Sequence, residues 1–277
     1  MLHESAGAAA DRRRSSRSRP EGEGEGGDLR HVILVADRFA QFADGEQVLT
    51  VSECTALAAA GKAEPTDGEW MLHLGQGIER SDLDALLDDG ATKKGSGMRL
   101  AAPGLPLSRP VRPPVVHKHR AENVLLADFR NFSKTHCAAG LRIHRDNEHL
   151  LDHHATRHVP GMLIVEAMRQ ICTAQFETSH RPGSPSEYAG IWHRIDISFD
   201  SFLFPLHAEV HSVITEFDEA KKSRLRFRTT TSARQNGGVV ARAEIEYSMV
   251  KQERIDLLEH RKAAGAVQSQ LARPQGL

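Results

Sequence analysis

The sequence predicts an α+β fold in which one antiparallel sheet curls around a single long helix, preceded by a small α/β module. Residues 162–177 form a helix that is apolar over roughly twice the arc of about 100° that a surface helix needs. Four long runs of alternating apolar and polar residues follow it, a pattern typical of half-buried antiparallel strands. Five prolines between residues 103 and 114 mark a stiff connector ahead of these elements. We therefore expect a boundary there.

Composition narrows the class of protein. A chain of 277 residues with 39% hydrophobic residues can form one large domain or two smaller ones. The formal charge of -1 argues against binding nucleic acid through bulk electrostatics. The cysteines lie far apart, which fits a reducing compartment better than a disulfide framework. No apolar run is long enough to span a bilayer, and the first residues lack the apolar core of a signal peptide. We expect a cytoplasmic protein with neither nucleic-acid nor membrane partners.

Residues 1–28 join a basic run to a run of glutamate and glycine. Such a composition cannot bury enough apolar surface to offset chain entropy, so a disordered tail is predicted. The basic run would suit RNA or an acidic lipid surface, but a solvated tail is the favoured interpretation.

Residues 29–98 predict a small α/β module. The expected elements are a strand over His31–Ala36, a strand or helix over Val48–Ala60, a strand over Trp70–Leu74, and a helix over Ser81–Leu87 with Ser81 as its N-cap. Gly75 and Gly77 raise the possibility of a phosphate-binding loop, but the longer fingerprint is missing and a plain turn is favoured. The sequence assigns this module no function.

Beyond the connector at residues 99–114, residues 115–252 predict the curled sheet. The expected strands are Glu122–Phe129, Ala139–His144, Tyr188–Phe199, Leu206–Phe217, Ser223–Arg234 and Val239–Met249. Asn236-Gly237-Gly238 is a strong hairpin signal between the last two strands. Residues 253–277 are expected to be a C-terminal tail with room for a short helix.

The central helix carries one polar stripe. At about 100° per residue, the stripe holds Glu166, Arg169, Gln170, Thr173 and Glu177. It either meets water through one slot or lines a cavity, and in a cavity both charges must be paired or used.

Three motifs carry a resemblance to a known family: Val116-His-Lys118, Glu122-Asn-Val-Leu-Leu126, and His158-Val-Pro-Gly-Met-Leu-Ile-Val-Glu-Ala-Met-Arg-Gln170. The order of elements resembles the hotdog fold of acyl-thioester enzymes. The motifs resemble the A-factor biosynthesis (AfsA-type) hotdog family, over roughly residues 115–252. A single hotdog domain is therefore expected after the α/β module.

The resemblance implies an acyltransferase of secondary metabolism that uses no cofactor. It would transfer a β-ketoacyl group from an acyl carrier protein or CoA thioester to the hydroxyl of dihydroxyacetone phosphate, on the way to γ-butyrolactone or butenolide signals. The family's functional Glu and Arg map onto Glu166 and Arg169. Typical members carry two hotdog copies in one chain, whereas one is visible here, which implies a homodimer.

The residues themselves fit this chemistry. Attack of an alcohol on a thioester needs a base, donors to the oxyanion and a hold on the acceptor. Glu166 is the candidate base, with its pKa raised by desolvation and that shift opposed by Arg169. Arg169 can bind a phosphate bidentately. Backbone N–H groups at Gly161 and Met162 are candidate oxyanion donors. The substrate-binding residues predicted beside Gly161 and Met162 are His158 and Gln170.

Other interpretations remain open. Glu166 and Arg169 also suit a simple helical ion pair on a solvated stripe. The cluster His149, His153, His154 and His158 lacks the partners of a recognisable zinc spacing, so no metal is predicted. The alternative activities are a hotdog dehydratase, which would pair a histidine with the helix carboxylate, and a thioesterase. A non-catalytic acyl-binding regulator, using the N-terminal module to contact a partner, is the third alternative.

Overall fold

The computed structural model describes residues 29–60, 70–88, 98–101, 109–151, 157–183, 187–221 and 223–272. The predicted tail at residues 1–28, the connector residues 102–108, His153 and His154 lie outside the described residues.

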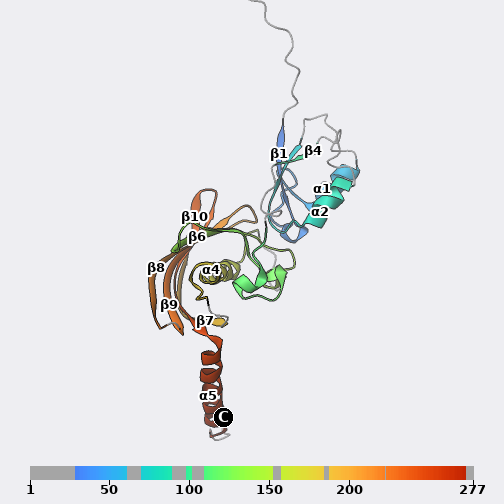
Figure 1. Cartoon of the computed structure of the whole chain (residues 1–277). Helices are drawn as coiled ribbons and strands as arrows, with labels where there is room; N and C mark the ends of the chain where they lie inside the picture. The colour runs from blue at the N-terminus through green and yellow to red at the C-terminus, as the bar shows by residue number, and fades with distance from the viewer. Residues whose placement is uncertain are drawn as a thin grey trace, which may run out of the picture.

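The predicted α+β arrangement is confirmed, with a six-stranded antiparallel sheet that curls around α4, Gly161–Gln175 (Figure 1). The strands lie in the order β5-β6-β8-β9-β10-β7. Their bounds are β5 Leu126–Asn131, β6 His136–Leu141, β7 Tyr188–Phe199, β8 Glu209–Lys221, β9 Arg224–Gln235 and β10 Gly238–Lys251. Asn236 and Gly237 both adopt positive φ, 51° and 78°, which is the geometry that a tight hairpin between twisted strands requires.

The helix is held by apolar contacts on most of its circumference. Leu163, Ala167, Met168 and Ile171 are fully buried against the inner face of the sheet. Near the end of α4, where the chain forms one π turn, η5 (Phe176–His180), a row of stacked rings crosses four strands. The row is Phe217, Phe227, Tyr247 and Trp192, with successive ring centroids 4.9 Å apart. These cross-strand pairs fix the register of the sheet beneath the helix.

Three predicted strands are displaced, and the third of them runs over Glu209–Lys221 (β8) instead of Leu206–Phe217. The first begins at Leu126 instead of Glu122, because Ala121–Asn123 form a short 3-10 turn (η4) and Leu125 packs under α4. The second ends at Leu141, and Arg142 leaves the sheet to pair with Glu79 of the N-terminal module. Further short helical segments are η3 Pro113–Val116 and α3 Glu148–Leu151.

The described residues between 30 and 100 form a second, parallel sheet in the order β2-β1-β3-β4. Its elements are β1 Arg30–Val35, η1 Asp37–Phe39, β2 Val48–Thr50, α1 Val51–Ala59, β3 Trp70–Leu74, α2 Arg80–Asp88 and β4 Met98–Leu100. The run from Val48 is both strand and helix, because Thr50 caps α1 through a capping box with Glu53. The prediction that Ser81 is the N-cap of this helix is wrong, since α2 already begins at Arg80.

The predicted C-terminal tail is largely helical. α5, Gln252–Leu271, continues from β10 and projects away from the sheet (Figure 1). Among its residues, Ile255 is the buried one. None of the described helices combines the length and apolarity needed to cross a membrane.

Candidate active site

The polar stripe of α4 lies beneath a strap, which we define as residues 113–125. Arg169 Nη2 donates to Val116 O at 3.1 Å, and Gln170 Nε2 donates to Asn123 O at 2.8 Å. Gln170 Oε1 accepts from Leu125 N at 2.8 Å. Glu177, at the far end of the stripe, pairs with His117 at 3.1 Å. The stripe therefore meets another part of the chain along most of its length, instead of an open slot.

Glu166 sits at the centre of a charged cluster, which we define as Lys118, Glu166 and Arg169. Its carboxylate accepts two bonds from the Arg169 guanidinium, at 2.8 and 2.9 Å. Lys118 Nζ lies 2.8 Å from Oε1, and Gln170 Nε2 donates to the same oxygen at 3.0 Å. The Glu166 side chain is 13% exposed.

These partners overturn the predicted direction of the Glu166 pKa. Burial raises the pKa, but the hydrogen bonds and charge of Arg169, with the bonds from Lys118 and Gln170, outweigh burial and lower it to about 2. A carboxylate this acidic stays ionised at neutral pH and is a weak proton acceptor. Glu166 is therefore suited to holding cations in place.

The same pKa predicts acid sensitivity. A carboxyl whose pKa falls from 4.5 to about 2 on folding stabilises the fold fully above pH 4.5, and this stability is lost as the pH falls through 2. The linked free energy of unfolding is about 3 kcal/mol. We expect Glu166→Gln to be less stable than the wild type by about this amount at pH 7, and the difference to shrink towards zero near pH 2. Urea titrations at several pH values measure it; a constant difference would contradict the assignment.

The charged cluster borders the side of α4 that the sheet leaves uncovered. Met162, one turn before Glu166 and two before Arg169, is 69% exposed. The side chains of Lys118 and Arg169 keep 23% and 21% of their surface accessible. Two cations around one carboxylate leave a net positive charge at a partly open surface, which favours an anion.

A separate hollow of about 520 Å³ lies at the start of α4, and we call it the α4 hollow. Its lining residues are His158, Val159, Gly161, Ile164, Phe199, Asp200, Ser201, Phe202 and Leu203. The His158 ring packs on Phe202, with centroids 4.7 Å apart. A Cβ at Gly161 would lie 3.2 Å from the Phe199 ring, so glycine keeps this wall close. Pro160, the N-cap residue, makes no side-chain cap bond to the N–H groups of the first turn.

The structure divides the predicted site residues between two places. His158 and Gly161 line the α4 hollow, whereas Met162 is exposed beside it. Glu166 and Arg169 belong to the charged cluster. Around the helix axis, Glu166 lies about 200° from Ile164, which lines the hollow. Gln170, predicted to bind substrate, is fully buried and uses its amide to hold the strap and Glu166.

Two parts of the site were missed by the sequence analysis. Lys118 belongs to the Val116-His-Lys118 motif, which could have indicated that it is a site residue. Its contact with Glu166, however, is created by the fold and is not visible in the sequence. The wall at residues 199–203 follows a predicted strand and has no motif of its own. Among the described residues, no three His, Cys, Asp or Glu side chains lie close enough together to hold a metal ion.

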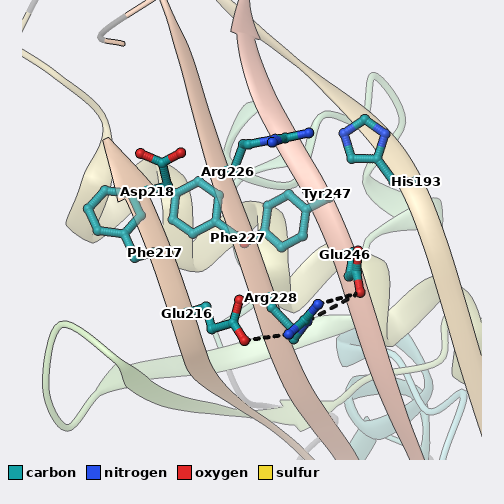
Figure 2. A pocket seen from close by; sticks show the side chains of 9 residues that line it. All are labelled: His193, Glu216, Phe217, Asp218, Arg226, Phe227, Arg228, Glu246 and Tyr247. Carbon is teal, nitrogen blue, oxygen red and sulfur yellow. Dashed lines mark hydrogen bonds and ion pairs between the residues drawn. The ribbon is translucent and has the colours of Figure 1, made fainter. Parts of the chain in front are cut away.

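A larger hollow of about 620 Å³ lies on the outer face of the sheet (Figure 2). Arg228 is clamped there between Glu216 and Glu246. The lining of this hollow contains three carboxylates, those of Glu216, Glu246 and Asp218, and two arginines, Arg226 and Arg228. This balance disfavours a phosphate, so the outer hollow is not a candidate acceptor site.

Residues 101–251, more than half of the 277, match the family model described as the A-factor biosynthesis hotdog domain. The family resemblance stated from the motifs is thereby confirmed. No curated protein gave a significant match.

Several solved structures are similar to part of the chain. A putative thioesterase related to phenylacetic acid degradation, from Ralstonia eutropha, is 10% identical over 44% of this chain and 83% of its own, with a TM-score of 0.34. A dehydratase heterocomplex, ApeI:P, from Xenorhabdus doucetiae is 18% identical over 50% and 91%, with a TM-score of 0.40. A hypothetical thioesterase with coenzyme A from Streptococcus pneumoniae is 9% identical over 45% and 86%, with a TM-score of 0.32.

Proposed function

Because this chain belongs to the A-factor biosynthesis hotdog family, we propose that it is an acyltransferase acting on acyl thioesters. It transfers a β-ketoacyl group from an acyl carrier protein or CoA thioester to the hydroxyl of a small phosphorylated acceptor such as dihydroxyacetone phosphate. The observation that carries the proposal is that an apolar hollow lies at the N-terminus of α4 while a cationic cluster is held around Glu166 of the same helix.

In the proposed reaction, the acyl chain lies in the α4 hollow against Ile164 and Leu203. The thioester oxygen faces the backbone N–H groups at Gly161 and Met162, which with the helix dipole stabilise the developing oxyanion. The acceptor hydroxyl attacks the carbonyl carbon, a C–O bond forms, the C–S bond breaks, and the leaving thiolate takes a proton. His158 is the one imidazole among the lining residues, and an imidazole is the side chain that most often accepts a hydroxyl proton in general base catalysis.

The charged cluster holds the acceptor in this proposal. Arg169 and Lys118 bind its phosphate, and Glu166 fixes the two cations in place instead of acting as the base predicted from the sequence.

We further propose that the protein acts as a homodimer, because the hollow and the cluster face different sides of α4 within one protomer. β7 is an edge strand of twelve residues and ends at Phe199, in the wall of the hollow. Ile195 and Phe199 on this strand are 39% and 50% exposed. A long edge with exposed apolar residues is a ready site for pairing with a second copy. Such a dimer would place the hollow walls of the two protomers, at Phe199 of each β7, near the shared edge. Sedimentation measures the oligomeric state directly.

The proposal is tested by product analysis. Purified protein receives a β-ketoacyl thioester with and without dihydroxyacetone phosphate, and products are identified by mass spectrometry. We expect a phosphorylated ester that requires both substrates. Free acid in both tubes would reassign the protein as a thioesterase, and an enoyl thioester from a β-hydroxyacyl donor would reassign it as a dehydratase. Thioester binding without any product would leave the acyl-binding regulator.

A further inference from the structure

The N-terminal module contacts the hotdog domain through the carboxyl ends of its parallel strands, which is the edge where open α/β sheets of other proteins bind their ligands. In the order β2-β1-β3-β4, the chain leaves β1 towards β2 and leaves β3 towards β4, in opposite directions along the sheet. Where two neighbouring strands are left in opposite directions, a crevice is expected at their carboxyl ends. Gln76 lies two residues after the end of β3 at this point. Its backbone oxygen accepts at 3.1 Å from the N–H of Ala36, the residue directly after β1. What fills this crevice therefore bears on the role of the module.

The crevice is filled by the hotdog domain itself. Gln76 is 3% exposed. Its Nε2 donates to Leu141 O and Leu206 O, both at 3.0 Å, and its Oε1 accepts from Ile143 N at 2.8 Å. Its backbone N–H donates to Pro205 O at 3.0 Å. One glutamine thus joins the end of β6 to the segment before β8.

The two flanking glycines have different parts in this contact: Gly75 allows the close approach to Pro205, and Gly77 allows the turn to pack on the end of β1. A Cβ at Gly75 would lie 2.8 Å from Pro205 O, closer than real Cβ atoms approach a backbone oxygen. Gly77 adopts φ +78°, and a Cβ there would lie 2.7 Å from Ala36 Cβ. The Gly75-Gln76-Gly77 turn is therefore built for close docking between the two domains, in agreement with the predicted plain turn.

The segment held in this way continues from the wall of the α4 hollow. Phe42 of the module stacks on Phe204, with ring centroids 5.5 Å apart. On the other side, Gln235 accepts from Phe204 N and donates to Phe204 O, both at 3.0 Å. The neighbouring Leu203 lines the hollow, and its carbonyl accepts from Val159 N at 2.7 Å. Residues 204–206 are thus held between the module and β9, and we call them the gripped segment.

We propose that the N-terminal module is a positioning element for the α4 hollow, with Gln76 and Phe42 as the positioning residues. Through Phe204, Pro205 and Leu206 they fix the wall formed by residues 199–203, and so set the length of acyl chain that the hollow accepts. The last step rests on the proposed function; the positioning itself does not.

The structural half of the proposal is tested by hydrogen–deuterium exchange. Two amides of the gripped segment are hydrogen-bonded: Phe204 N donates to Gln235 Oε1 at 3.0 Å, and Leu206 N donates to Phe204 O at 2.7 Å. We expect their protection to fall at least tenfold in Gln76→Ala and in the milder Phe42→Ala. The matched control is Arg38→Ala, because Arg38 Nη2 also joins the module to the hotdog domain, by donating to Leu151 O at 2.9 Å, but does not touch the gripped segment. Unchanged protection in the folded Phe42 variant, or an equal loss in the Arg38 control, would overturn the proposal.

The functional half is tested with a series of acyl thioesters of increasing chain length. We expect Phe42→Ala and Gln76→Ala to raise KM for the longest accepted chains about tenfold while kcat and short-chain KM change less than threefold. Arg38→Ala should keep the wild-type profile. An identical profile in all three variants would overturn the claim about chain length. If the wild type neither binds nor turns over any thioester, the proposed function fails, and the exchange experiment still decides the positioning role.

Discussion

Arg169→Ala is expected to lower kcat/KM for the phosphorylated acceptor by about 100-fold. Arg169 offers the bidentate guanidinium that a phosphate favours, and about a fifth of its side chain is accessible on the uncovered side of α4. The protein should still fold, because Lys118 and Gln170 continue to compensate the Glu166 carboxylate. Steady-state kinetics with the acceptor as the varied substrate provide the measurement, and binding of the thioester alone should be retained.

Arg181→Ala is the matched control for this experiment. Arg181 pairs with Glu177, the last acidic residue of the same polar stripe, at 2.7 Å, but lies outside the charged cluster. Its loss should leave acceptor kinetics within about twofold, because Arg181 pairs with Glu177 and not with the charged cluster. Wild-type kinetics in Arg169→Ala, or an equal defect in both variants, would remove Arg169 from the proposed acceptor site.

Gln170→Leu is expected to lower the free energy of unfolding by about 2–5 kcal/mol. The Gln170 amide is fully buried, and its loss leaves Leu125 N and Asn123 O without their partner inside the protein. Each buried polar group left unsatisfied costs about 1–3 kcal/mol. Denaturant titration of the two proteins, followed by tryptophan fluorescence, measures the difference.

Gln175→Leu offers a control on the same helix. Gln175 is equally buried, but its Nε2 has no hydrogen-bond partner among the described residues, and its Oε1 accepts one bond, from Ser212 Oγ. Replacing it removes an unsatisfied donor, which offsets part of the loss. We expect a change of about 1 kcal/mol or less. Equal destabilisation by the two substitutions would show that the strap contacts contribute nothing specific.

The sequence predicted the order of the elements of the curled sheet well, because apolar periodicity reports burial directly. Tyr188–Phe199 has the predicted bounds, and apolar and polar residues alternate over its second half, from Ile195 to Phe199. The predictions failed where burial and strand pairing diverge. Val124 and Leu125 are buried without belonging to β5, since they pack under α4 as part of the strap. Apolar pattern alone cannot distinguish these two kinds of burial.

The site was predicted less completely, because its chemistry depends on partners distant in sequence. A raised Glu166 pKa followed from its apolar neighbours Val165 and Ala167, but Lys118 comes from 48 positions earlier and reverses the balance with Arg169. The polar stripe gave no indication that Gln170 would be used to hold the strap. Helical spacing located the polar residues correctly and left their partners undetermined.

The projecting helix α5 affects how unfolding is to be observed. With 20 residues it extends for about 30 Å, and of its side chains Ile255 is buried. An isolated helix of this length is only marginally stable in water, so its outer turns fray independently of the sheet. Circular dichroism at 222 nm, which is sensitive to helix, would include this fraying. Emission from the two tryptophans, Trp70 in β3 and Trp192 in β7, would report the two sheets instead. Midpoints from the two signals need not coincide, and a mismatch between them would be no sign of a folding intermediate in the hotdog domain.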